Sequence, residues 1–173
     1  NYRYYFGSSG KRATWKKRWA KVGTHYYYFG SVAGRVVEKH GWNAITNTKG
    51  KFIGWFYFDA NGNHYTDKWT SNGYYFMPSG KLASGFVEIN GKGYLFEVSS
   101  AAEHKGKVYK NTMVRYKKKW YIASSTGSLY KNGWKKFNKK YYYLKDYVVQ
   151  TNLFVARNGV NGYIDSNGVF RTG

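Results

Sequence analysis

Residues 69–85 read Trp-Thr-Ser-Asn-Gly-Tyr-Tyr-Phe-Met-Pro-Ser-Gly-Lys-Leu-Ala-Ser-Gly. The Tyr-Tyr-Phe triplet at its centre favours a strand, because aromatic side chains pack well on a pleated surface. Polar segments that contain Gly73 and Gly80 flank the triplet, and Gly in such segments favours tight turns. The stretch therefore predicts short strands joined by turns, for which a β-hairpin is the simplest assignment.

The same pattern recurs along the whole chain: two or three adjacent aromatic or aliphatic residues, then a turn that ends in Gly. Eight residues, each ending one copy and separated by steps of 18 to 29 residues, mark the repeats: Phe6, Phe29, Phe58, Phe76, Phe96, Ile122, Leu144 and Ile164. An isolated hairpin is only marginally stable in water, so the hairpins must stack to share their rings. We therefore predict an all-β fold, an elongated solenoid of stacked β-hairpin repeats of about 20 residues each.

The predicted domain organisation is one repeat array over residues 1–173. It has about eight hairpin units, with insertions near residues 43–53 and 97–110. Asn-Gly pairs at residues 61–62 and 167–168 are expected to supply the positive φ angles of tight hairpin turns. Because the chain begins with Asn1 and not with Met, we expect it to be a piece of a longer precursor.

Composition supports a core made of aromatic rings. Leu, Ile, Val and Phe together make up 34 of the 173 residues, which alone would suggest a disordered chain, but Trp, Tyr and Phe contribute 38 rings. The chain contains no Cys, which excludes disulfides, thiolate nucleophiles and iron–sulfur clusters. No apolar run approaches the roughly 18 residues that a membrane-spanning helix needs. We expect no cofactor.

The repeat resembles the cell-wall-binding and glucan-binding repeats of Gram-positive surface proteins, a family that includes choline-binding modules and the glucan-binding regions of glucansucrases. Its unit is similar to Gly-Trp, about four residues, Gly, one or two residues, Tyr-Tyr-Phe, three residues and Gly. Residues 69–85 follow this unit almost throughout, and so do residues 41–42 with 54–62. The resemblance covers nearly the whole chain and is looser over residues 98–119 and 146–158.

The resemblance implies a non-catalytic module that anchors a secreted protein to the surface of a Gram-positive bacterium, with ligand sites between consecutive hairpins. Strand alternation places Tyr74 and Phe76 on one face and Tyr75 on the other, so one set of rings packs inward and the other can line grooves. Most rings are expected to form the core. We expect the ligand-facing rings to be Trp42, Trp55, Trp69, Tyr75, Trp134 and Tyr142.

Choline-binding members of the family hold a quaternary ammonium in a box of aromatic rings by cation–π attraction. The box uses the Trp of Gly-Trp and a Trp just before the Tyr-Tyr pair. In this chain the second position is occupied by Arg3, Tyr26, Trp55, Gly73, Gly93, Lys119, Tyr141 and Asn161. Because only Trp55 completes the pattern, the sequence looks closer to the glucan-binding branch, and we do not expect free choline to elute the protein from walls.

The charge points to a polyanion. Lys and Arg total 29 against 8 Asp and Glu, a formal net charge of +21, with 22 Lys and 7 Arg. Clustered basic residues are expected to contact teichoic or lipoteichoic acid, because the mobile ammonium group of lysine can contact the phosphates of a flexible polymer. These are Lys16, Lys17, Arg18, Lys117, Lys118, Lys119, Lys135, Lys136, Lys139 and Lys140. The simpler alternative is a solvated basic face that keeps the protein soluble.

Other functions are less well supported. A period of 20 residues fits no common nucleic-acid-binding module, and no basic amphipathic helix for a membrane surface is visible. The four histidines His25, His40, His64 and His104 are scattered and are expected to be surface or strand residues rather than metal ligands. No acidic pair stands in a catalytic motif, so we do not expect an enzyme. The alternative function is the α-glucan-binding region of an extracellular glucansucrase, where rings stack on glucose and charge matters little.

Overall fold

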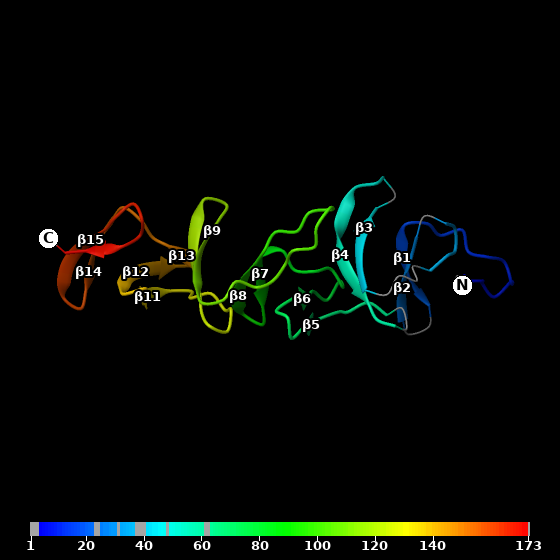
Figure 1. Ribbon diagram of the computed structural model, residues 1–173, viewed down its shortest axis with the longest axis horizontal. Coiled ribbons are helices and arrows are strands. Elements are labelled where there is room, and N and C mark those ends of the chain that lie inside the picture. The colour runs from blue at the N-terminus through cyan, green and yellow to red at the C-terminus, as the bar shows by residue number, and fades with distance from the viewer. Residues whose placement is uncertain are drawn as a thin grey trace. The chain divides into compact units, whose positions relative to one another are not determined.

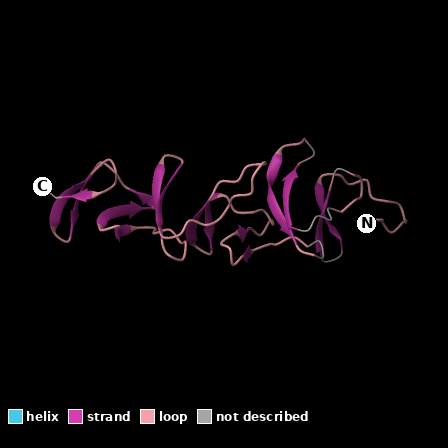
Figure 2. Cartoon of the chain, viewed as in Figure 1, coloured by secondary structure: helices cyan, strands magenta, loops and turns pink. Residues whose placement is uncertain are grey.

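The computed structural model describes residues 4–22, 25–30, 32–36, 41–47, 49–60 and 63–172. Over these ranges the chain forms strands, turns and loops without a helix (Figure 2). The described residues therefore contain no helix long and apolar enough to span a membrane. The contacts divide the chain into two compact units. Unit 1 comprises residues 1–84 and 98–107, and unit 2 comprises residues 85–97 and 108–173. The prediction of an all-β fold built from hairpin repeats is confirmed.

In the described part of the chain, every strand pairs antiparallel with a strand next to it in sequence (Figure 1). The strands of unit 1 are β1 Arg18–Val22, β2 His25–Phe29, β3 Gly41–Thr46, β4 Phe52–Phe58, β5 Lys68–Trp69 and β6 Tyr75–Phe76. Those of unit 2 are β7 Gly85–Ile89, β8 Lys92–Phe96, β9 Thr112–Tyr116, β10 Lys119–Ala123, β11 Gly133–Phe137, β12 Lys140–Lys145, β13 Val148–Val149, β14 Leu153–Arg157, β15 Val160–Ile164 and β16 Phe170–Arg171. β11–β12–β13 and β14–β15–β16 form three-stranded sheets, and the other pairs are two-stranded hairpins.

The residue that ends each copy of the sequence pattern forms the core. Seven of the eight marker residues are at most 1% exposed: Phe29, Phe58, Phe76, Phe96, Ile122, Leu144 and Ile164. Phe6 differs, being 55% exposed and joined only by an isolated bridge to Arg12. One fully buried side chain therefore recurs in each of these repeats, as expected when hairpins share a continuous core.

The β3–β4 hairpin shows how a repeat uses both of its faces. On one face, Ile45 and Phe58 belong to a buried cluster with Tyr28 of the preceding hairpin. The register pairs Trp42 with Tyr57 and Ala44 with Trp55, so both tryptophans lie on the opposite face. The predicted insertion at residues 43–53 is part of these two strands and of the turn between them. The region predicted as an insertion near 97–110 contains the strand-free segment 98–107, which packs within unit 1.

Four-residue turns lie before or after several of the triplets. A Gly at the fourth position donates its N–H to the carbonyl of the first residue, as in Thr70–Gly73, Met77–Gly80, Ser124–Gly127 and Asp165–Gly168. Gly168 has a φ of 78°, but Asn167 before it does not adopt a positive φ. The prediction that both residues of this Asn-Gly pair adopt positive φ is therefore wrong for Asn167. The physical reason is that the Asp165 carboxylate accepts the N–H groups of Asn167 and Val169, both at 2.9 Å, and holds an Asx turn instead. Asn61 and Gly62 lie outside the described residues.

The two-residue hairpin turns have positive φ at both positions, which suits Asn and Gly best. Asn90-Gly91 and Asn158-Gly159 follow this rule. The β9–β10 turn instead consists of Lys117 and Lys118, with φ angles of 47° and 67°. Both lysines therefore adopt a left-handed conformation that costs an L-residue with a Cβ atom about 1 kcal/mol or more.

Replacing Lys117 with Asn and Lys118 with Gly is expected to raise the free energy of unfolding by about 1 kcal/mol, because these residues adopt positive φ at less cost. Denaturant unfolding followed by circular dichroism measures the change. The matched control places two lysines at Asn90 and Gly91, where the same reasoning predicts a loss of similar size. An unchanged midpoint in both variants would contradict the assignment of strain to the turn.

Candidate functional site

The structure divides the six predicted ligand-facing rings into two groups. Trp42, Trp55 and Trp134 are half-buried, and Trp69 is 39% exposed. Tyr75 and Tyr142 are instead buried, with exposures of 4% and 6%. Their burial corrects the expectation that these two rings face a ligand, because a ring enclosed by protein offers no face to a polymer. The binding role of the four tryptophans stays a prediction.

The environment of the two tyrosines explains their burial. The Tyr75 hydroxyl donates to Asp67 Oδ1 at 2.5 Å, and its ring contacts Trp69 with centroids 5.1 Å apart. Burial, the hydrogen bond to the Asp67 carboxylate and the negative charge of that carboxylate raise the pKa of Tyr75 to about 12. Tyr142 lies in a buried cluster with Ile122 and Leu144. Burial likewise raises the pKa of Tyr142.

Tyr75→Phe is expected to lower the free energy of unfolding by about 1 kcal/mol at neutral pH, the usual net worth of a hydrogen bond. The folded-state pKa of Tyr75 lies above its ordinary value of 10.0, so this contribution is complete below pH 10 and is lost as pH rises toward 12. Denaturant unfolding of both proteins between pH 7 and pH 12 should show the difference shrinking over the upper part of the range. A constant difference would contradict the role of the hydroxyl.

One group of aromatic rings is formed on the β3–β4 hairpin and the repeat that follows it. We call Trp42, Trp55, Tyr57 and Tyr74 the β3–β4 aromatic site. The Trp42 ring lies 5.4 Å from the Tyr57 ring on its own hairpin and 5.1 Å from the Tyr74 ring of the next repeat, centroid to centroid. Trp42 also lies 5.5 Å from Phe76. This arrangement places the Trp42 indole between two repeats, where a ligand-binding groove was predicted.

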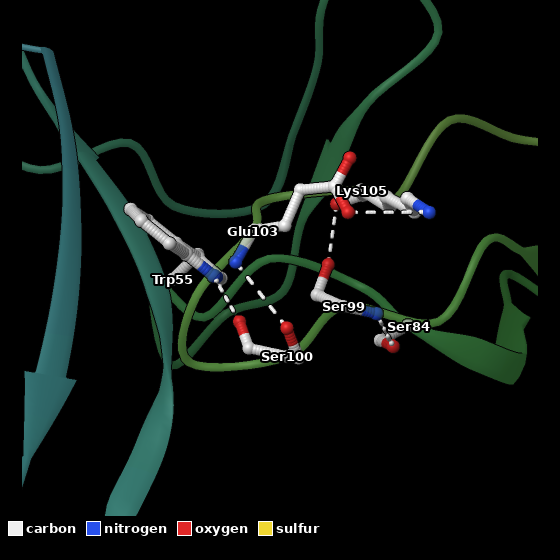
Figure 3. A network of polar contacts seen from close by, with 6 residues as sticks. All are labelled: Trp55, Ser84, Ser99, Ser100, Glu103 and Lys105. Carbon is white, nitrogen blue, oxygen red and sulfur yellow. Dashed lines mark hydrogen bonds and ion pairs between the residues drawn. The ribbon is translucent and has the colours of Figure 1, made fainter.

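The imidazole of His104 lies against both tryptophans of this site. Its centroid is 4.5 Å from that of Trp42, with an interplanar angle of 23°, and 5.2 Å from that of Trp55. Trp55 Nε1 donates to the Ser100 carbonyl at 2.6 Å, so the segment that carries His104 also holds Trp55 (Figure 3). His104 is half-buried and lies in a loop, and its contacts with two tryptophans were not expected from the sequence. Its position inside an insertion was the only signal in the sequence, because insertions have no repeat period.

Trp134 and Trp69 have different neighbours. The Trp134 ring contacts Tyr143 of its own sheet at 5.2 Å and Phe170 of the following sheet at 5.0 Å. Phe170 thus occupies, for Trp134, a position like that of Tyr74 for Trp42. Trp69 packs on Tyr75 and keeps part of its indole in solvent. Of these aromatic sites, the β3–β4 site is the one that combines two tryptophans.

The predicted basic residues are placed mainly on two hairpins of unit 2. Lys117, Lys118, Lys119, Lys136, Lys139 and Lys140 are exposed, and Lys135 is half-buried with Nζ 3.8 Å from the Tyr130 ring centroid. Residues 104–145, which include both hairpins β9–β10 and β11–β12, contain 12 Lys and one Arg and no Asp or Glu. We call these two hairpins the basic hairpins. No carboxylate of their own neutralises them.

The basic cluster of unit 1 lies apart from these in sequence. Lys16 and Arg18 are exposed, and Lys17 is half-buried with a φ of 46° just before β1. The Arg18 guanidinium carbon lies 5.7 Å from the Trp15 ring centroid. In unit 2, Lys135 and Lys136 lie in the middle of strand β11. Strand alternation accounts for the difference in their exposure.

Two of the acidic residues, Asp59 and Asp165, lie in turns. The Asp59 carboxylate accepts the N–H of Asn63, and Asp165 caps the turn described above. Burial opposes the ionisation of Asp165, but hydrogen bonds from Val169, Arg171 and Asn167 outweigh it and lower the pKa of this carboxyl. Both carboxylates thus stabilise turns. Within the part of the chain that the structure describes, no three His, Cys, Asp or Glu side chains converge on a possible metal site.

No known family model matches the chain, and no curated protein sequence matches it. Solved structures do. Choline binding protein F from Streptococcus pneumoniae is 26% identical with a TM-score of 0.67, and the match covers 97% of this chain and 55% of that chain. A complex of the same protein with ipratropium is 25% identical with a TM-score of 0.69, covering 97% and 57%.

CbpJ from Streptococcus pneumoniae shares the fold at 23% identity, with a TM-score of 0.67 and coverage of 97% and 56%. This chain therefore spans little more than half the length of the solved chains that it matches. The likeness lies in the fold, which in the described residues of this chain consists of consecutive antiparallel hairpins. The chain is accordingly similar in fold to choline-binding proteins, which agrees with the resemblance of its repeats to choline-binding and glucan-binding repeats.

Proposed function

We propose that this chain is a non-catalytic module that anchors a secreted protein to the cell wall of a Gram-positive bacterium by binding anionic wall polymers, with teichoic or lipoteichoic acid as the main partner. The fold shared with pneumococcal choline-binding proteins supports a role at the wall. The observation that carries the choice of polymer is the pair of basic hairpins, with no acidic residue between positions 104 and 145.

The chemistry of lysine suits a flexible polymer of phosphates. An ammonium is a compact charge on a mobile stem, so it needs no fixed geometry to follow a phosphate backbone. Each exposed contact is worth only about 0.2–1 kcal/mol, and affinity must therefore come from many contacts made together. Lys118 and Lys139 lie in the turns at the ends of two successive hairpins, where their ammonium groups can make such contacts.

A wall polysaccharide or an α-glucan is the second candidate, and Trp69 is the observation that favours it. Its indole is 39% exposed and supported from behind by the Tyr75 ring. A supported, partly exposed indole can stack on the apolar face of a sugar ring, much as aromatic rings stack on one another. Such stacking does not depend on charge, which separates the two candidates experimentally.

The test measures retention of the purified protein on cell walls, teichoic acid, peptidoglycan and dextran at low and at molar salt. We expect binding to walls and teichoic acid at low salt and its loss at molar salt, because salt screens exposed charges. Retention that survives molar salt would overturn the polyanion proposal, and retention on dextran under the same conditions would favour the α-glucan candidate. Millimolar free choline should not elute the protein.

A further inference from the structure

The β3–β4 aromatic site already contains a ring from another part of the chain. We propose that His104 is an internal ligand of this site, and that the loop of residues 98–107 acts as a strap that closes the site to small organic cations. This inference does not depend on the polyanion proposal, because the site lies in unit 1 and the basic hairpins lie in unit 2. His104 then decides what the site can bind.

The two indoles of the β3–β4 aromatic site have the chemistry to bind an organic cation. An organic cation is attracted to the face of an indole when it lies within about 6 Å of the ring centroid. The His104 imidazole meets this condition for two indoles at once, at 4.5 Å from Trp42 and 5.2 Å from Trp55. It lies nearly parallel to Trp42, at 23°, and tilted by 58° against Trp55. An external cation that used both indoles would need the space that this imidazole fills.

Hydrogen bonds of its own serines shape the strap. Ser99 N–H donates to Ser84 Oγ at 3.1 Å, and the Ser99 hydroxyl donates to the Lys105 carbonyl, which ties the two ends of the loop together. Ser100 donates its N–H to the Glu103 carbonyl at 3.1 Å and accepts the Glu103 N–H on its hydroxyl at 3.2 Å. The loop is therefore shaped mainly by its own hydrogen bonds, as Figure 3 shows. Such a loop can leave the hairpin without unfolding it.

A hydrogen bond attaches the strap to the β3–β4 hairpin. The direct polar link from the hairpin is the bond from Trp55 Nε1 to the Ser100 carbonyl at 2.6 Å. Glu103 is the acidic side chain of the strap, and it pairs with Lys105 at 3.2 Å, with both side chains more than half exposed. The strap thus neutralises its own carboxylate and presents an imidazole to the indoles. Among the described residues, the hydrogen bond from Trp55 and the ring contacts of His104 with Trp42 and Trp55 hold the strap against the site.

The experiment uses tetramethylammonium chloride as the probe, with sodium chloride at equal concentration as the ionic control. Tryptophan fluorescence is titrated in the whole chain, in His104→Ala and in His104→Phe. The Ala variant removes the internal ligand, so we expect it to bind the probe about tenfold more tightly than the unchanged chain, which corresponds to about 1.4 kcal/mol. The Phe variant keeps a ring in the site and should bind no better than the unchanged chain.

Equal affinity of the unchanged chain and of His104→Ala would overturn the proposal, and so would a Phe variant that binds as tightly as the Ala variant. Should His104→Ala fail to fold, proton NMR of the unchanged chain provides a second measurement. The ring protons of His104 should lie upfield of their usual position because of the Trp42 ring current, and saturating probe should move them back. Unshifted ring protons in the free protein would also refute the proposal. Retention of His104→Ala on teichoic acid should equal that of the unchanged chain.

Discussion

Phe76→Ala is expected to lower the free energy of unfolding by about 3–5 kcal/mol, the cost of deleting a large aromatic side chain from a packed core. Phe76 is 0% exposed, and its ring contacts Trp42 at 5.5 Å, Tyr65 at 5.5 Å and Tyr57 at 6.4 Å. Removing it takes away the ring that joins two successive repeats. Because most domains are stable by only about 5–15 kcal/mol, this single change should unfold a large part of unit 1 at modest denaturant concentration.

The matched control is Phe154→Ala, which makes the same chemical change on strand β14. Phe154 is 84% exposed, so its removal loses little buried surface and should change stability by no more than about 0.5 kcal/mol. Guanidinium unfolding followed by tryptophan fluorescence and by circular dichroism measures both variants. Similar losses for Phe76 and Phe154 would show that the buried residue of each repeat does not dominate the core.

The second large effect concerns binding. Replacing Lys118, Lys139 and Lys140 with Gln is expected to weaken binding to teichoic acid about tenfold at low salt, since three exposed charge contacts of about 0.5 kcal/mol each are lost. All three side chains are exposed at the turn ends of the basic hairpins. Gln keeps most of the side-chain length and removes the charge, so the fold should be unaffected. The dependence of affinity on salt should become shallower as well.

The control removes the same number of charges from unit 1, with Gln at Lys11, Lys49 and Lys51, which are also exposed. Net charge changes equally in both variants, so a general effect of net charge would weaken both equally. We expect the control to retain most of its affinity. Equal losses in the two variants, measured by retention on immobilised teichoic acid, would argue that the positive field of the whole chain matters and the basic hairpins do not.

Much of the fold follows from local pattern. The last residue of each triplet recurs with the repeat, and seven of the eight are buried. Strand alternation predicted that one set of triplet rings packs inward. The turns beside the triplets were expected from their glycines, and Gly73, Gly80 and Gly168 do adopt positive φ. These features depend on a few neighbouring residues, which is why the repeat pattern predicts them.

Two site features could not be predicted in the same way. Tyr75 and Trp69 lie in one repeat and both were expected to face a ligand, yet Tyr75 is 4% exposed and Trp69 is 39% exposed. The difference arises because Trp69 and Asp67 cover the Tyr75 ring and hydroxyl. His104 was missed altogether, because it follows no repeat and its partners Trp42 and Trp55 lie about 50 to 60 residues earlier in the chain.

The sequence by itself determined the repeating hairpins and the acid-free basic stretch, because each of these depends on neighbours within about 20 residues or on composition alone. Only the tertiary structure decided which aromatic faces are open. Whether a ring on a hairpin surface meets solvent, the next repeat or a strap is set by contacts between distant segments, and strand alternation specifies the face of a ring but not what covers it.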